Sequence, residues 1–104
     1  MEAATSLAPA HHTVLALTGE LCLAELPGVR DRIEAAVEAG ATTLVIDLAA
    51  TTLVTAAALR VFESAGQRLE AQGGALVLRN PAPLARRVLE ITGLDRLLEP
   101  CPAA

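Results

Sequence analysis

Few side chains in this sequence have the types and spacing that catalysis or metal binding requires. His11 and His12 are neighbours, and in a strand they would point to opposite faces, where they cannot easily share a metal ion. The serines are Ser6 and Ser64, and neither forms a recognisable nucleophile–base pair. No glycine-rich loop with a lysine is present to hold a phosphate. The sequence therefore predicts no enzyme, no metal site and no cofactor.

The segment from residue 44 to residue 62 is the most informative part of the chain. Its first three residues are apolar, which is typical of a strand buried on both faces, and Asp47 is expected to end that strand. A threonine-rich turn follows, and Thr55 is well placed to cap a helix that begins near Ala56. The junction between strand and helix carries no charge, which favours an apolar contact surface over a reactive site.

Composition restricts the classes of partner. The chain has 104 residues, which suit one domain, and 53% of them are hydrophobic but only 1% aromatic. Aromatic platforms for stacking nucleic-acid bases are therefore nearly excluded. The net charge is −4, with eight arginines and no lysine, and no basic cluster exceeds Arg86-Arg87. We expect no nucleic-acid partner and no binding to anionic membranes.

The lack of recognisable targeting signals and the spacing of the cysteines indicate a reducing compartment. No apolar run approaches the roughly 20 residues of a membrane span, and the start of the sequence lacks the features of a signal peptide. We therefore expect a cytoplasmic protein without membrane insertion. Cys22 and Cys101 are far apart in sequence and fit two free thiols better than a disulfide.

Strands and helices are expected to alternate, which predicts a largely parallel sheet. Residues 1–10 form a flexible tail in this interpretation, and residues 11–104 form a single domain. The helix after residue 55 should bury Ala58, Val61, Phe62, Ala65 and Leu69. The expected strands are 13–18, 20–23, 43–47, 75–79 and 97–98. The last helix should begin at Pro83, end at Gly93, and turn Leu84, Val88 and Ile91 toward the core.

Two blocks of the sequence resemble the STAS domain, the fold of bacterial anti-sigma factor antagonists. Asp47, Leu48, Thr52 and Leu59 match the family's pattern around the strand–helix junction. Residues 80–95 are similar to its closing block, in which an Asn-Pro turn starts a helix that ends in Thr-Gly-Leu. The resemblance covers residues 13 to 99. It implies an α/β fold with a mixed, mostly parallel sheet of four to five strands and three main helices.

The same resemblance implies a docking site at the strand–helix junction. The family's regulatory tetrapeptide has become Thr55-Ala56-Ala57-Ala58, so the residue that is phosphorylated in the family corresponds to Ala57, which has no hydroxyl. Phosphorylation at Thr52 or Thr55 stays open, as does the alternative of an ordinary alanine-rich helix start. The predicted partner-binding residues are Thr52, Val54, Thr55, Ala56, Ala57, Ala58 and Arg60.

By resemblance, the chain is a non-catalytic regulator that binds an anti-sigma factor with a serine-kinase-type ATPase fold. One alternative is a STAS-type cytoplasmic subunit of a lipid ABC transporter, in which the same helix face docks on an ATPase. Another is a small-ligand sensor that uses the helix N-terminus. The sequence leaves open which partner binds and whether the chain forms a homo-oligomer.

Overall fold

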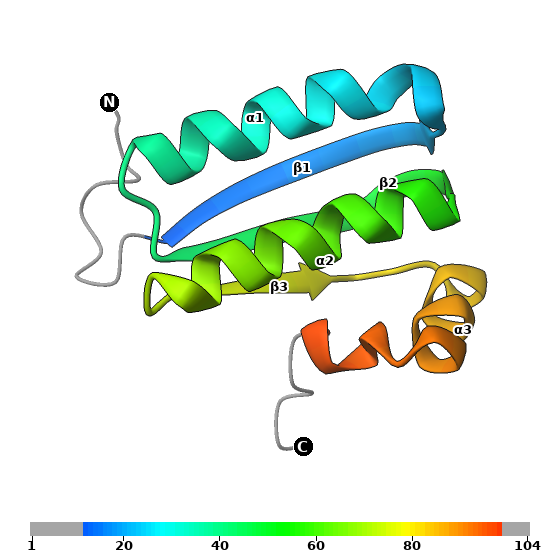
Figure 1. Cartoon of the computed structure of the whole chain (residues 1–104). Coiled ribbons are helices and arrows are strands. Elements are labelled where there is room, and N and C mark those ends of the chain that lie inside the picture. Colours follow the sequence, from blue (N-terminus) through cyan, green and yellow to red (C-terminus); the bar gives the residue numbers. More distant parts are fainter. Residues whose placement is uncertain (1–11, 99–104) are drawn as a thin grey trace.

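Strands and helices alternate along the chain in the computed structural model, which describes residues 12–98 (Figure 1). The three strands form one sheet in the order β1-β2-β3, and both pairs are parallel, as the alternation predicted. The expected tail, Ser6, His11 and Cys101 lie outside the described residues. The elements are β1 (His12–Leu21), α1 (Leu26–Glu38), β2 (Thr43–Val54), α2 (Ala56–Ala71), β3 (Ala75–Arg79) and α3 (Pro83–Thr92), with short 3-10 helices at Leu23–Glu25 and Leu94–Leu97.

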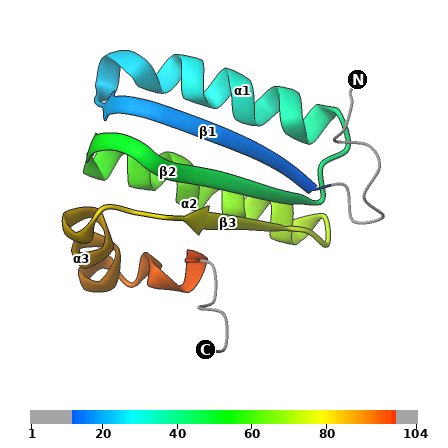
Figure 2. The same cartoon turned by 180° about the vertical axis from the view of Figure 1, so that it is seen from behind.

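The central strand β2 organises the core. Leu44, Ile46 and Leu48 alternate along it and are almost completely buried with the apolar faces of α1 and α2. Figures 1 and 2 show α1 and α2 on one side of the sheet and the strands in front when the molecule is turned around. Val45 is also buried, which confirms the prediction that this apolar run is buried on both faces.

The number of strands differs from the expected four to five, because the structure has three in its described part. The expected strand 13–18 and the first half of the expected strand 20–23 form one strand, β1, which Gly19 does not interrupt and which ends at Leu21. Leu23 belongs instead to a 3-10 helix. Two shifts in the β1–β2 register, between Ala16 and Thr18 and between Gly19 and Glu20, absorb the irregularity. A local irregularity in one strand therefore looked like a strand boundary in the sequence.

Two of the three remaining strand predictions, 43–47 and 97–98, also need correction, whereas 75–79 agrees with β3. Asp47 does not end β2, since the threonine-rich segment continues as strand to Val54 beside the last residues of β1. The expected strand at 97–98 is reduced to a single parallel bridge between Leu98 and Leu78. Leu97 belongs instead to a 3-10 helix and is buried in the core.

Helix α2 agrees with its predicted pattern, and α3 does not. All five residues of the predicted inward stripe of α2 are buried. In α3, however, Leu84 is 72% exposed and Ile91 76% exposed, while Val88 is half-buried and Leu89 is fully buried. An amphipathic pattern shows which side of a helix is apolar but not whether the same chain covers that side. Most of the predicted inward face of α3 is therefore surface.

Two glycines are required by the backbone, one at the end of α3 and one before β3. Gly93 has a φ of +79° and ends α3, as predicted, because a left-handed residue at this position requires little or no side chain. A Cβ atom added to Gly74 would lie 2.1 Å from the carbonyl oxygen of Thr42. The next residue, Ala75, donates its backbone N–H to that same oxygen at 2.8 Å. Gly74 thus allows the chain leaving α2 to approach the start of β2.

The hydroxyl of Thr55 joins the end of β1 to the start of α2. It accepts a hydrogen bond from the backbone N–H of Ala58 at 3.3 Å, which confirms the predicted helix cap. The same hydroxyl donates to the carbonyl oxygen of Leu21 at 2.7 Å. One side chain therefore satisfies a polar group on β1 and another on α2. Thr55 and Leu21 are 34 residues apart in sequence.

The burial of Phe62 leads to a first prediction. Phe62 is the only aromatic residue and is fully buried, so Phe62→Ala should lower the free energy of unfolding by about 3–5 kcal/mol. Phe62→Leu, which leaves a smaller gap, should cost clearly less. Urea unfolding of both variants measures the difference. Equal losses would show that Phe62 is not closely packed.

A second prediction concerns Thr55. Thr55→Val keeps the shape of the side chain but removes both hydrogen bonds, leaving the Leu21 carbonyl and one helix N–H without this partner. We expect a loss of about 1–3 kcal/mol in the free energy of unfolding. Thr55→Ser retains the hydroxyl and should lose less than half as much. Thermal and urea unfolding test this, and a Thr55→Val variant as stable as the parent would contradict it.

Candidate functional site

The residues predicted to bind a partner divide into exposed and buried groups. Thr52, Ala56 and Arg60 are exposed, Val54 and Thr55 are half-buried, and Ala58 is fully buried. The side chain of Ala58 belongs to the core, so it cannot contact a partner in this structure.

Ala57 was expected at the surface, and the structure makes it only half-exposed. Its methyl group packs against the hydrophobic core, whereas Ala56 one residue earlier is open to solvent. The exposed part of the helix start is therefore centred on Ala56. A substitution at position 57 would affect packing as well as the surface.

An apolar groove lies beside this helix start, at the edge of the sheet where β2 ends. We call it the β2–α3 groove; its volume is about 200 Å³. None of its lining residues carries a charge. The lining residues are Thr51, Thr52, Leu53 and Val54 from β2, and Ala82, Leu84, Ala85 and Val88 from α3 and the residue before it.

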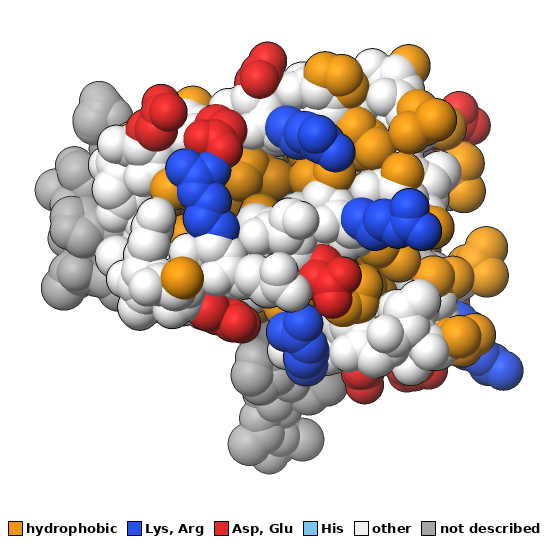
Figure 3. All heavy atoms as spheres, viewed as in Figure 1, with side chains coloured by type: hydrophobic (Ala, Val, Ile, Leu, Met, Phe, Trp, Pro, Cys, Tyr) orange, Lys and Arg blue, Asp and Glu red, His pale blue; other side chains and the backbone are white. Residues whose placement is uncertain are grey.

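Apolar side chains remain exposed around the β2–α3 groove. Leu53 is 41% exposed and Leu84 is 72% exposed. Figure 3 shows orange side chains along the right-hand edge of the molecule, over the end where α1 and α2 begin and α3 lies. Sequence reasoning missed Leu53, Leu84 and Ala85 as surface residues. For Leu84 and Ala85, the sequence feature that could have indicated a surface position is the apolar stripe of α3, which the sequence pattern places in the core.

The hydroxyl groups near the β2–α3 groove differ in availability. Thr51 is buried and donates to the carbonyl oxygen of Leu48 at 2.7 Å, and Thr55 is occupied by its two hydrogen bonds. Thr52 is exposed. Thr52 is therefore the threonine of this segment that is most accessible to a modifying enzyme.

Asp47 has a structural role in this arrangement. Its Oδ1 atom accepts a hydrogen bond from the backbone N–H of Ala49 at 2.9 Å and from Asn80 Nδ2 at 3.5 Å. These contacts connect the middle of β2 to the turn after β3. The geometry gives Asp47 a positioning function.

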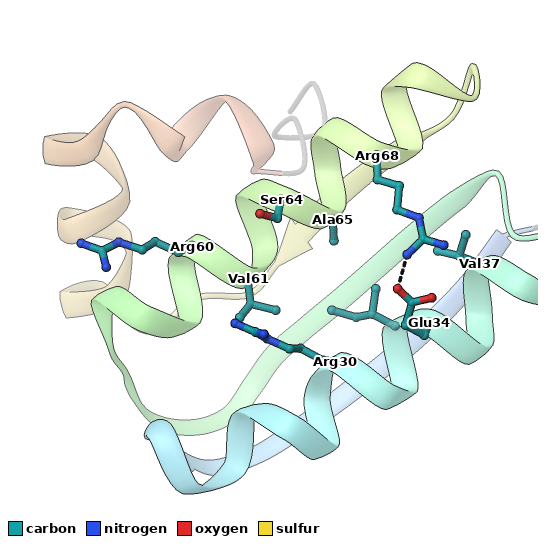
Figure 4. Close-up of a pocket in the computed structure, with 9 residues that line it drawn as sticks. Arg30, Glu34, Val37, Arg60, Val61, Ser64, Ala65 and Arg68 are labelled. Carbon is teal, nitrogen blue, oxygen red and sulfur yellow. Dashed lines mark hydrogen bonds and ion pairs between the residues drawn. The ribbon is translucent and has the colours of Figure 1, made fainter.

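A second groove lies between α1 and α2, and we call it the α1–α2 groove (Figure 4). Arg68 of α2 forms an ion pair across it with Glu34 of α1. The hydrogen bond and charge of Glu34 raise the pKa of Arg68 above its ordinary value. Arg60, one of the residues predicted to bind a partner, lines this groove and not the β2–α3 groove.

Metal binding and membrane insertion find no support in the described part of the chain. Residues 12–98 contain no group of three or more histidine, cysteine, aspartate or glutamate side chains that is suited to a metal ion. Within the same residues, none of the helices has the length and apolar character needed to cross a bilayer.

Comparison with solved structures identifies the fold. The anti-sigma factor antagonist SpoIIAA in its unphosphorylated form has a TM-score of 0.77 at 24% identity, over 88% of this chain and 80% of that one. Its phosphorylated form, from Bacillus, has a TM-score of 0.72 at 23% identity, over 92% and 87%. An anti-sigma factor antagonist from Mycobacterium paratuberculosis has a TM-score of 0.77 at 26% identity, over 86% and 78%.

Comparison at the level of sequence identifies the family. None of the curated proteins matches the sequence significantly. The profile of the family described as "Mlab, STAS domain" matches residues 5–99, which is nearly the whole chain. This match agrees with the parallel sheet, the three helices and the strand–helix junction described above. The chain therefore belongs to the STAS domain family.

Proposed function

We propose that this STAS domain is a non-catalytic regulator that binds a protein partner through one end of the molecule. The docking surface consists of the exposed start of α2 at Ala56 and the adjoining β2–α3 groove. The observation that carries the proposal is the exposure of Leu53 and Leu84 beside an uncharged groove. Large apolar side chains that gather on a surface typically mark an interaction site.

The chemistry of this surface favours an apolar element of a partner protein. No charged side chain lines the β2–α3 groove, so a charged ligand would lose water there without gaining a counter-ion. The groove volume of about 200 Å³ is small for an organic ligand but is suited to one or two side chains from a larger interface.

The proposed partner is an anti-sigma factor with an ATPase fold. Two of the structurally similar proteins are anti-sigma factor antagonists. Their resemblance supports this class of partner, and the position of the apolar surface next to the α2 start agrees with it. By binding such a factor, the chain would release a sigma factor for transcription in the cytoplasm.

Regulation by phosphorylation at position 57 is not part of the proposed function. Ala57 has no hydroxyl, and the neighbouring hydroxyl of Thr55 is occupied in capping α2. Constant docking also suits a second function, that of a structural subunit in a lipid ABC transporter, which would need no such switch. The identity of the bound protein distinguishes the two functions.

Capture from the native cytoplasm tests the proposal. The tagged full chain is used as bait, and captured proteins are identified by mass spectrometry. A kinase-type anti-sigma factor supports the leading function, and a transporter ATPase supports the second. If neither class binds the parent chain more than an unrelated STAS domain, the proposed function is wrong.

A third prediction separates binding from folding. Leu84 and Ile91 lie on the same helix and are similarly exposed, but only Leu84 lines the β2–α3 groove. Leu84→Gln should raise the Kd for the captured partner about tenfold or more, as expected for a residue at the centre of an interface. Ile91→Gln is the matched control and should have little effect. Isothermal titration measures both, and equal effects would contradict the assignment.

The start of α2 provides a companion variant for the same titration. Ala56 is exposed at the first position of the helix, where a carboxylate stabilises by about 0.3–1 kcal/mol. Ala56→Asp should therefore keep the melting temperature but weaken partner binding, because the new charge loses water in an apolar contact. Unchanged affinity would remove the α2 start from the docking surface.

A fourth prediction concerns phosphorylation. Incubated with ATP and its captured kinase-type partner, the parent chain should gain no phosphate, whereas Ala57→Ser should gain one at residue 57. Intact-mass and peptide mass spectrometry measure both proteins. Phosphate on Thr52, the accessible hydroxyl of the β2–α3 groove, would instead show that the switch has moved to the neighbouring strand.

A further inference from the structure

The α1–α2 groove is elongated and has an apolar floor. Its volume is about 290 Å³. On α1 its lining runs from Arg30 to Val37, and these two residues, seven positions apart, are separated by a rise of about 10 Å along the helix. The floor consists of Ile33, Val37, Val61 and Ala65, and Figure 3 shows it as an orange strip between the two helices.

The two ends of this groove differ in charge. Toward the later turns of the helices, the Arg68–Glu34 ion pair spans the groove and neutralises both charges. Toward the earlier turns lie Arg30 and Arg60, and neither has an ion-pair partner among residues 12–98. Each is the fifth residue of its helix, so the positive ends of two helix dipoles lie at the same end.

This positive end is unusual for the composition of the chain. The protein has a net charge of −4, yet two of its eight arginines, Arg30 and Arg60, lie together at this end of the groove. Unpaired guanidinium groups next to an apolar channel are suited to a ligand that has an anionic head and an apolar tail.

We propose that the α1–α2 groove binds a small amphiphilic monoanion, namely a carboxylate at the end of a short unbranched hydrocarbon chain. The carboxylate would be bound by Arg30 and Arg60, and the chain would lie along Val61, Ile33 and Ala65. This site is separate from the docking surface of the proposed function.

Binding requires one local change. Figure 4 shows Arg30 extending toward Val61, whereas Arg60 extends from α2 away from Arg30 and Arg68. Arg60 is exposed, and exposed side chains change rotamer within nanoseconds. The Ser64 hydroxyl, which also lines the groove, is a second donor that can reach a carboxylate.

Octanoate is the probe for this site. Amide resonances of the isotope-labelled full chain are followed while octanoate is added, in parallel with octanamide and acetate. Octanoate should give saturable shifts at α1 and α2 residues of the groove. Octanamide cannot form the charge-assisted hydrogen bonds of a carboxylate and should bind at least about tenfold more weakly. Acetate lacks the chain and should also bind at least about tenfold more weakly, since two buried methylene groups alone account for about tenfold. Equal binding of octanoate and octanamide would overturn the proposal.

Paired variants locate the anion. Arg30→Gln combined with Arg60→Gln should raise the Kd for octanoate about tenfold or more, because charge-assisted hydrogen bonds are lost. Arg86→Gln combined with Arg87→Gln changes the charge equally on α3, outside the groove, and should leave the Kd within about twofold. Equal weakening in both pairs, or an absence of saturable shifts in the parent chain, would overturn the proposal.

Discussion

The hydrogen bonds of the Thr55 hydroxyl are the constraint on which the proposed docking end of this protein depends. Its two hydrogen bonds, to Ala58 N–H and to the Leu21 carbonyl, connect the end of β1 with the start of α2. Because β2 leads directly into α2, this connection also fixes where β2 ends. Thr55 lies between Val54, the last residue of β2, and Ala56, the exposed first residue of α2, and links this junction to the end of β1.

The apolar surface at the end of β2 exists because no other part of the described chain covers the exposed side chains of α3 and β2. Leu89 of α3 is buried with Leu94 and Leu97, which anchors the helix beside β3. Leu84 and Ile91 of α3 remain exposed, and Leu84 lies next to the last residues of β2. The apolar side chains of Leu53 and Leu84 that this packing leaves exposed form part of the proposed docking surface.

Helix α2 takes part in two surfaces of opposite character. Its first residue adjoins the uncharged β2–α3 groove, and its outer side forms one wall of the cationic α1–α2 groove. Between them, the buried stripe from Ala58 to Leu69 holds the helix on the sheet. Substitution of an exposed side chain at either surface, such as Arg60 or Leu84, can therefore leave the packing that maintains the fold unchanged.

The sequence by itself determined the alternation of elements, the buried stripe of α2, the Thr55 cap and the Gly93 helix end. Each of these depends on local chemistry or on the period of a single element. The tertiary structure decided that β1 is continuous, that β2 extends to Val54 and that the apolar stripe of α3 is largely exposed. It also placed Arg60 along the α1–α2 groove and joined Glu34 to Arg68. These features depend on which elements meet, and periodicity within one segment carries no information about its neighbours.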